Sequence, residues 1–132
     1  GQPDPGFDFE NRSLIKYRLI IEEFGGWDAF QALLRTLRGV ADRRGGDIAA
    51  VATRAMLDDP DVAACIIGAR YARHLPRLLA ALDVTLDDAD RAEIAALHAA
   101  APGPSGVVYG LERDKTGPHG RIMKYNLNEG VA

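Results

Sequence analysis

Apolar residues recur every three or four positions along much of the chain. The first such stripe covers Ser13–Phe24, and a longer one covers Trp27–Arg44. This spacing places the apolar side chains on one face of a helix. Gly25–Gly26 and Gly45–Gly46 interrupt the pattern, as expected at helix boundaries. The pattern therefore predicts two helices here, preceded by an irregular lead-in over residues 1–12.

Three further helices are predicted between Asp47 and Ala100. Asp47 can cap a helix over Ile48–Leu57, and a fourth helix is expected over Ala72–Leu82. Thr85-Leu86-Asp87-Asp88 resembles a capping box that opens a fifth helix ending near Ala100. Residues 13–100 are thus expected to form a helical core. Residues 101–132 contain little periodicity and are expected to form an extended tail.

One segment has the pattern of a buried strand. Residues 62–67, with the sequence VAACII, are an unbroken apolar run between Pro60 and Gly68. Such a run is typical of a strand covered on both faces in a parallel sheet. The expected fold class is therefore mainly α, with about five helices and at most one or two short strands. A single strand has no partner in its own chain, so its partners must come from elsewhere or the strand is lost.

The length and composition of the chain argue against several classes of protein. The chain has 132 residues, which is too short for a complete eight-fold βα barrel of at least about 200 residues. A net charge of −3 argues against a nucleic-acid partner, and no apolar run is long enough to span a membrane. The single cysteine, Cys65, excludes an internal disulfide and, with no apolar leader, predicts a cytoplasmic protein. The histidines and the cysteine are not spaced as the ligands of a metal site usually are, so no metal is expected.

The candidate site residues follow the predicted strand. Arg70, Arg73 and Arg77 recur at spacings that share one helix face and could hold a phosphate or carboxylate. Tyr71 and His74 stand beside them and could move protons, so they are the candidate catalytic residues. His98 is expected near a helix end, and His119 in an exposed turn. Cys65 is expected to be a core residue of the strand.

The order of these elements resembles the last βα unit of the aldo-keto reductase family. The resemblance is carried by Ala49–Arg54, by Val62–Arg70 and by Leu82–Asp90. The flanks resemble one branch of the family, with the cues Asn11–Leu14, Phe24–Trp27, Leu111–Asp114 and Ile122–Asn128. Members are NADP(H)-dependent carbonyl reductases on a (β/α)8 barrel. The resemblance implies that the catalytic Asp, Tyr, Lys and His belong to earlier strands that have no counterpart here.

The resemblance also implies a cofactor role for the turn after the strand. In the family this turn and the following helix hold the adenosine phosphate of NADP, and Gly68 and Arg70 match that pattern, with Arg73 close by. Family members then carry Glu-Asn, in which the Asn contacts the adenine. Arg77-Leu78 stands at those positions, and leucine cannot form that hydrogen bond.

Two hypotheses follow from these observations. In one, the chain is the C-terminal part of a reductase, and a complementing N-terminal half supplies the tetrad and completes the NADP site. In the other, it is a stand-alone protein without a cofactor. It would then be a homodimer with a small-molecule ligand. It would either perform non-redox proton chemistry on that ligand, such as cyclisation, isomerisation or dehydration, or only bind it.

Overall fold

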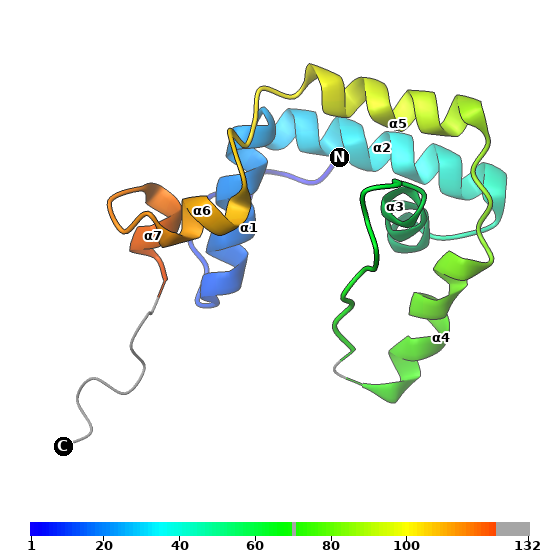
Figure 1. Cartoon of the computed structure of the whole chain (residues 1–132), viewed down its shortest axis with the longest axis horizontal. Helices are drawn as coiled ribbons and strands as arrows, with labels where there is room; N and C mark the ends of the chain where they lie inside the picture. Colours follow the sequence, from blue (N-terminus) through cyan, green and yellow to red (C-terminus); the bar gives the residue numbers. More distant parts are fainter. Residues whose placement is uncertain (70, 124–132) are drawn as a thin grey trace. The chain divides into compact units, whose positions relative to one another are not determined.

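The computed structural model describes residues 1–69 and 71–123. Within these residues the chain is mainly helical, and it groups into two compact units (Figure 1). One unit contains residues 1–30 together with the C-terminal part from residue 101, and the other contains residues 31–100. The second helix runs through the boundary between the two units. The mainly α fold class is confirmed.

The first unit is built on helix α1, Arg12–Phe24. The side chain of Asn11 accepts a hydrogen bond from the backbone N–H of Ser13 and caps the helix. Gly25 ends it with φ 125°, a backbone conformation that favours glycine. Arg18 is buried, pairs with Asp4 at 2.7 Å and lies over the ring of Phe7.

Two short helices complete the first unit, and they correct one expectation. Helix α6 covers Val108–Arg113 and helix α7 covers Pro118–Arg121, within the region expected to be an extended tail. Each is shorter than two turns, so neither leaves a periodic pattern that sequence reasoning can detect. Residues 124–132 of the expected tail lie outside the described residues.

The second unit contains most of α2, Gly26–Arg44, and helices α3, Ile48–Leu57, and α5, Asp88–Ala100. Asp47 caps α3 by accepting a hydrogen bond from the N–H of Ala50 at 2.8 Å. Helix α3 has the predicted range, α2 begins one residue earlier than predicted, and α5 begins two residues later than its predicted capping box implies. Apolar side chains from them and from the segment before α5 form one core: Leu37, Val40, Ala41, Ala50, Val51, Ala81, Val84, Leu86 and Ile94.

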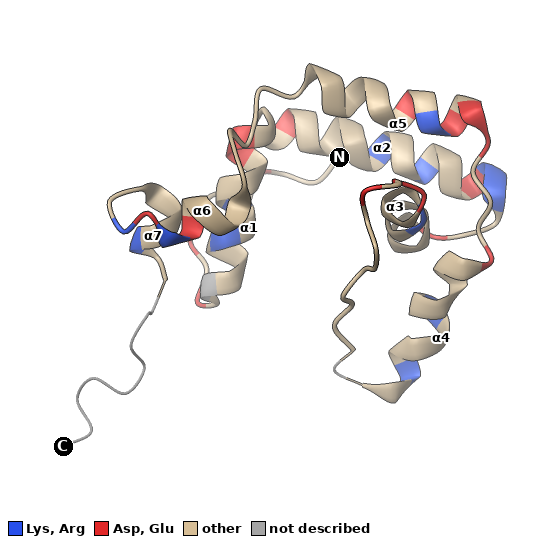
Figure 2. Cartoon of the chain, viewed as in Figure 1, with Lys and Arg blue, Asp and Glu red and all other residues tan. Residues whose placement is uncertain are grey.

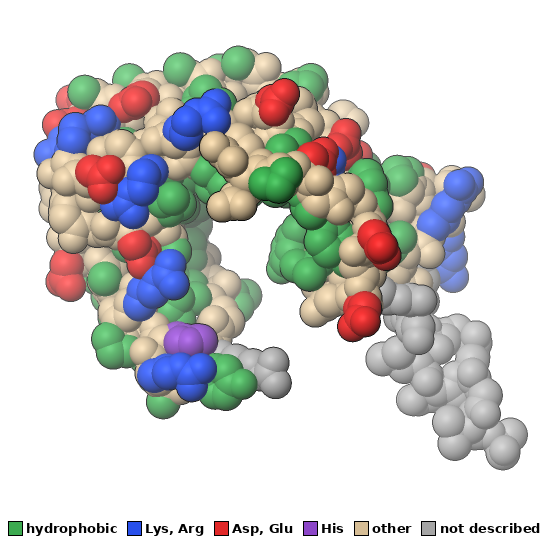
Figure 3. Space-filling model, turned by 180° about the vertical axis from the view of Figure 1, so that it is seen from behind, with side chains coloured by type: hydrophobic (Ala, Val, Ile, Leu, Met, Phe, Trp, Pro, Cys, Tyr) green, Lys and Arg blue, Asp and Glu red, His purple; other side chains and the backbone are tan. Residues whose placement is uncertain are grey.

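The predicted fourth helix is present but broken into three pieces. The 3-10 helix η1 covers Ala72–His74, α4 covers Leu75–Leu79, and the 3-10 helix η2 covers Ala80–Leu82. The side chains of Leu75, Leu79 and Leu82 are all more than two-fifths exposed. Other apolar side chains are also exposed on the surface, where they lie among charged side chains (Figure 3).

The predicted strand at residues 62–67 is not formed. These residues have no regular secondary structure, and the described chain contains no strand that could pair with them. Ile66 is fully exposed, Ile67 is 41% exposed, and Cys65 is half-buried instead of lying in a core. A strand requires a hydrogen-bonding neighbour, so an apolar sequence alone does not produce one.

Helices α2 and α5 are joined by ion pairs. Figure 2 marks the basic positions on α2 and the acidic positions on α5. Asp90 on α5 is 1% exposed, and it accepts hydrogen bonds from Arg43 at 2.9 Å and from Arg44. Asp87 and Asp90 also accept hydrogen bonds from each other's backbone N–H. This reciprocal pair is the capping box of α5, two residues later than the box expected from Thr85.

Candidate functional site

The candidate site residues lie on one exposed segment of the second unit. Tyr71 is the N-cap of η1, while Arg73 and His74 belong to that helix. The guanidinium carbon of Arg73 lies 4.2 Å from the centre of the Tyr71 ring, and the rings of Tyr71 and His74 meet edge to face at 5.5 Å. The structure therefore brings these three predicted residues into one cluster, here called the basic turn.

The basic turn has donors that are accessible to an anion. Arg73 and His74 are exposed, and no carboxylate among the described residues pairs with either side chain. Stacking on Tyr71 orients the guanidinium without using its N–H groups, so these remain able to bind a phosphate bidentately. Gly68 lies in open space, where an added Cβ would meet no atom within 4 Å. Arg70 lies outside the described residues.

Arg77, the third arginine of the expected cluster, has a different partner. Its guanidinium forms an ion pair with Asp47, the residue that caps α3. The backbone N–H of Ala50 and the side chain of Arg77 together hold the pKa of Asp47 below its usual value, although partial burial acts against them. Arg77 therefore links α4 to α3. The face of three arginines expected from spacing alone is not formed by Arg77 and Arg73.

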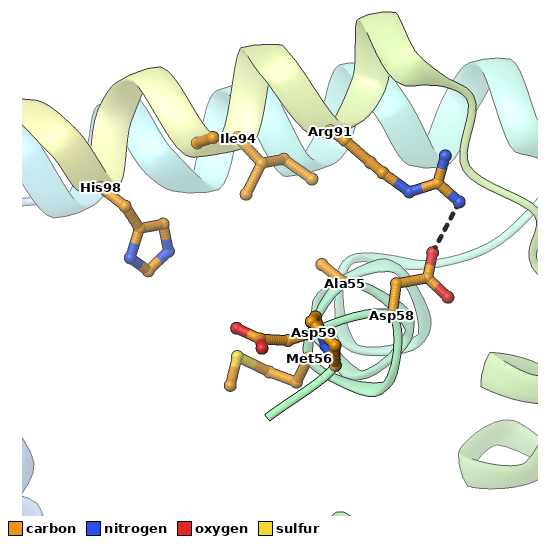
Figure 4. Close-up of a pocket in the computed structure, with 9 residues that line it drawn as sticks. Ala55, Met56, Asp58, Asp59, Arg91, Ile94 and His98 are labelled. Carbon is orange, nitrogen blue, oxygen red and sulfur yellow. Dashed lines mark hydrogen bonds and ion pairs between the residues drawn. The ribbon is translucent and has the colours of Figure 1, made fainter. Parts of the chain in front are cut away.

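A pocket that the sequence did not reveal lies between the end of α3 and α5. Its volume is about 480 Å³, within the range typical of small-molecule sites. The apolar walls of the pocket come from Ala55 and Met56 on the α3 side and from Ile94 and Ala95 on α5. Figure 4 shows side chains from the two helices around the same hollow.

Charged groups border this pocket on both sides. Arg91 donates a hydrogen bond to Asp58 at 2.9 Å, and Asp58 also accepts hydrogen bonds from Arg54 (Figure 4). The bonds from Arg54, followed by those from Arg91, hold the pKa of Asp58 below its usual value against the effect of burial. Asp59 and His98 complete the lining. The helix patterns alone give no signal for this pocket, because its lining combines the end of α3, the turn that follows it and α5, which are distant in sequence.

The residues that the structure describes contain neither a metal-binding cluster nor a membrane-spanning helix. No group of three histidine, cysteine or carboxylate side chains there is arranged to hold a metal ion. None of the helices in the described ranges is long and apolar enough to cross a membrane.

The comparison with known proteins supports the family resemblance that the sequence suggests. The aldo/keto reductase family model matches residues 2–99, which is most of the chain. The chain belongs to the aldo/keto reductase family. No curated protein and no solved structure was found to match it. The matched region includes the basic turn, the residues around the pocket and the segment 62–67, but not α6 or α7.

Proposed function

We propose that this chain supplies the adenosine-phosphate end of the NADP(H) site in an aldo/keto reductase barrel. The observation that carries the proposal is the segment 62–67, which is apolar, lacks strand structure and precedes the basic turn by a few residues in the sequence. A parallel barrel strand is covered on both faces, so such a sequence is stable only beside partner strands. We infer that the remainder of the barrel, which carries the catalytic tetrad, supplies these partners.

The residues of the basic turn fit the phosphate end of this cofactor. Arg73 would bind the phosphate with its free N–H groups, and Tyr71 would keep the guanidinium in place. His74 would add a second donor, and Gly68 leaves room for a close approach. Active sites of βα barrels lie at the carboxyl ends of the strands, and the basic turn follows the carboxyl end of 62–67. When bound, NADPH supplies the hydride for carbonyl reduction.

Recognition of the adenine would be weaker than recognition of the phosphate. Leu78 is half-buried on α4 and offers no hydrogen-bonding group to a base. Binding would therefore depend mainly on charge, and it should weaken as salt is added. The catalytic residues proposed from sequence, Tyr71 and His74, would then bind and orient the cofactor, with proton transfer left to the tetrad.

A titration followed by NMR tests this proposal. We expect 2′,5′-ADP to shift the backbone amides of residues 68–74 saturably, and 5′-AMP to bind more weakly. Replacement of Arg73 by alanine removes a charge-assisted contact and should weaken 2′,5′-ADP binding about tenfold or more. Arg38→Ala is the matched control, because Arg38 is exposed on α2 and pairs with Asp42.

The response to NADPH separates this role from that of a complete reductase. NADPH should bind this chain within about threefold of 2′,5′-ADP, because the nicotinamide half finds no further site on it. Absence of any saturable shift with 2′,5′-ADP would contradict the proposal. Equal binding to the Arg73→Ala variant would also contradict it.

The pocket between α3 and α5 supports a second candidate function. We infer that a chain acting alone would bind its small-molecule ligand there, with Met56 and Ile94 against the apolar part of the ligand. Asp59 and His98 would be the groups available for acid and base chemistry. Binding of the dye ANS tests this function. The larger side chain of Ala95→Trp should fill the hollow and exclude the dye. Lower dye fluorescence in this variant, with unchanged circular dichroism, supports the function; unchanged fluorescence argues against it.

A further inference from the structure

The pocket between α3 and α5 combines apolar walls with a charged border, and both helices belong to the second unit. Met56 and Ile94 contribute the largest apolar side chains of its lining. Ile94 is part of the buried core, whereas Met56 is exposed, so the apolar lining extends from the core to the surface. A ligand that covers this lining needs an apolar body. Apolar walls do not distinguish ligands by charge, so the charged border decides which ligand is accepted.

The positive charges of the border are already paired with carboxylates. Arg91 pairs with Asp58 at 2.9 Å and with Asp88 at 3.4 Å. Asp58 is also bound by the guanidinium of Arg54. An anionic ligand would have to compete with these carboxylates for Arg91, and it would be repelled by them. The border is therefore unfavourable for a carboxylate or a phosphate.

Asp59 is the carboxylate of the lining that has no cation beside it. Its Oδ1 accepts the backbone N–H of Asp61 at 2.9 Å, and within the described residues no arginine or lysine pairs with it. Figure 4 shows its side chain beside that of Met56, extending from the end of α3 on the side where His98 lies. The C-terminal end of α3 adds the partial negative charge of a helix dipole at the same place. Both features favour a positively charged group at Asp59.

The charge of the whole lining agrees with this preference. Apart from His98, its charged side chains are two carboxylates and one guanidinium, so they carry a net negative charge. A cation placed at Asp59 would also avoid Arg91, whose guanidinium is held by Asp58.

We propose that the pocket binds a small organic cation, with the apolar body of the ligand against Met56 and Ile94 and its ammonium group at Asp59. This inference rests on the second candidate function, a small-molecule site in the pocket, and adds the chemical class of the ligand. The ammonium group donates charge-assisted hydrogen bonds to the carboxylate. A neutral ligand of the same shape lacks these bonds, and an anionic one is repelled.

Three probes of similar shape test the preference for charge: hexylamine, hexanol and hexanoate. Binding is followed by NMR at constant pH and salt, as saturable shifts of the backbone amides of residues 55–59 and 91–98. Hexylamine should bind about threefold more tightly than hexanol, as expected for one ion pair at an exposed carboxylate. Hexanoate should bind more weakly than hexanol. Added salt should reduce the difference between hexylamine and hexanol.

Substitution of Asp59 identifies the group that selects the cation. Asp59→Asn removes the charge and keeps an oxygen for the N–H of Asp61, so hexylamine and hexanol should then bind equally well. Asp61→Asn is the matched control, because Asp61 is exposed, lies two residues away and is not part of the lining. This control should retain the preference for hexylamine. Arg73→Ala, which tests the basic turn, should leave the binding of all three probes unchanged.

The proposal is overturned if hexylamine and hexanol bind the unmodified chain equally, or if hexanoate binds most tightly. It is also overturned if Asp59→Asn retains the preference, or if Asp61→Asn reduces it as much as Asp59→Asn does. In each of these cases the saturable binding of hexanol still supports a small-molecule pocket, so the second candidate function survives without the charge preference. If none of the three probes shifts these amides, both are overturned.

Discussion

Replacement of Asp90 by asparagine should destabilise the second unit more than any other single charge removal on α5. Asp90 is 1% exposed, and it joins α5 to the end of α2 through Arg43 and Arg44. Asparagine has nearly the same shape and still offers one oxygen acceptor. The substitution therefore removes the negative charge without creating a cavity.

The magnitude follows from the two arginine contacts. Hydrogen bonds to charged groups contribute about 1.5–3 kcal/mol each, against about 0.5–1.5 kcal/mol for neutral ones. Arg43 is half-exposed and also pairs with Glu93, and Arg44 keeps Asp87 as a partner, which reduces the loss. We expect the free energy of unfolding to fall by about 2 kcal/mol at pH 7.

The pH dependence of this loss has a definite sign. Burial raises the pKa of Asp90, but hydrogen bonds from Arg43 and Arg44 outweigh burial and leave it below the usual value. A lowered pKa contributes stability that is complete above the unfolded carboxyl value of about 3.9 and is lost as the pH falls further. The difference between the original chain and Asp90→Asn should therefore persist from pH 7 to about 5 and shrink below about 4.

Urea unfolding followed by circular dichroism measures this difference. Asp88→Asn is the matched control, because Asp88 is fully exposed on the same helix and has one long contact with Arg91. The control should leave the unfolding midpoint unchanged. The reasoning fails if Asp90→Asn is as stable as the control at pH 7, or if the difference increases in acid.

Three further predictions follow from named contacts. Leu86→Ala removes a side chain that is 2% exposed, and it should lower the free energy of unfolding by about 3 kcal/mol in urea melts. Asp47→Ala deletes the cap of α3 and the partner of Arg77; about 1 kcal/mol should be lost, whereas Asp42→Ala should have little effect. Cys65 should react with a thiol reagent in the folded chain within about tenfold of its rate in urea; strong protection would indicate a buried strand.

The longer helices could be predicted because each has a local signal. The range Ile48–Leu57 agrees fully, since Asp47 caps its start and Pro60 follows its end. The sequence predicts the capping box of α5 two residues too early, because Thr85 and Asp87 are both acceptable caps and only the packing distinguishes them. Helices α6 and α7 were missed because a few residues cannot show a period.

The candidate site was predicted only in part. Tyr71, Arg73 and His74 do form one cluster, because residues this close in sequence meet in a single turn. Arg77 pairs instead with Asp47, 30 residues earlier, and no local pattern reports such a contact. The burial of His119 against Glu23 spans 96 residues and depends on tertiary packing in the same way. The apolar run at residues 62–67 predicts a strand that the structure does not form, because the described chain contains no strand to pair with it.

Hydrogen exchange at residues 62–67 tests the central claim most directly. These amides should be unprotected in the chain alone, and they should become protected when the tetrad-bearing part of an aldo/keto reductase barrel is joined to it. Protection of 62–67 already present in the isolated chain would contradict the account, because the segment would then have found its strand partner without the rest of the barrel.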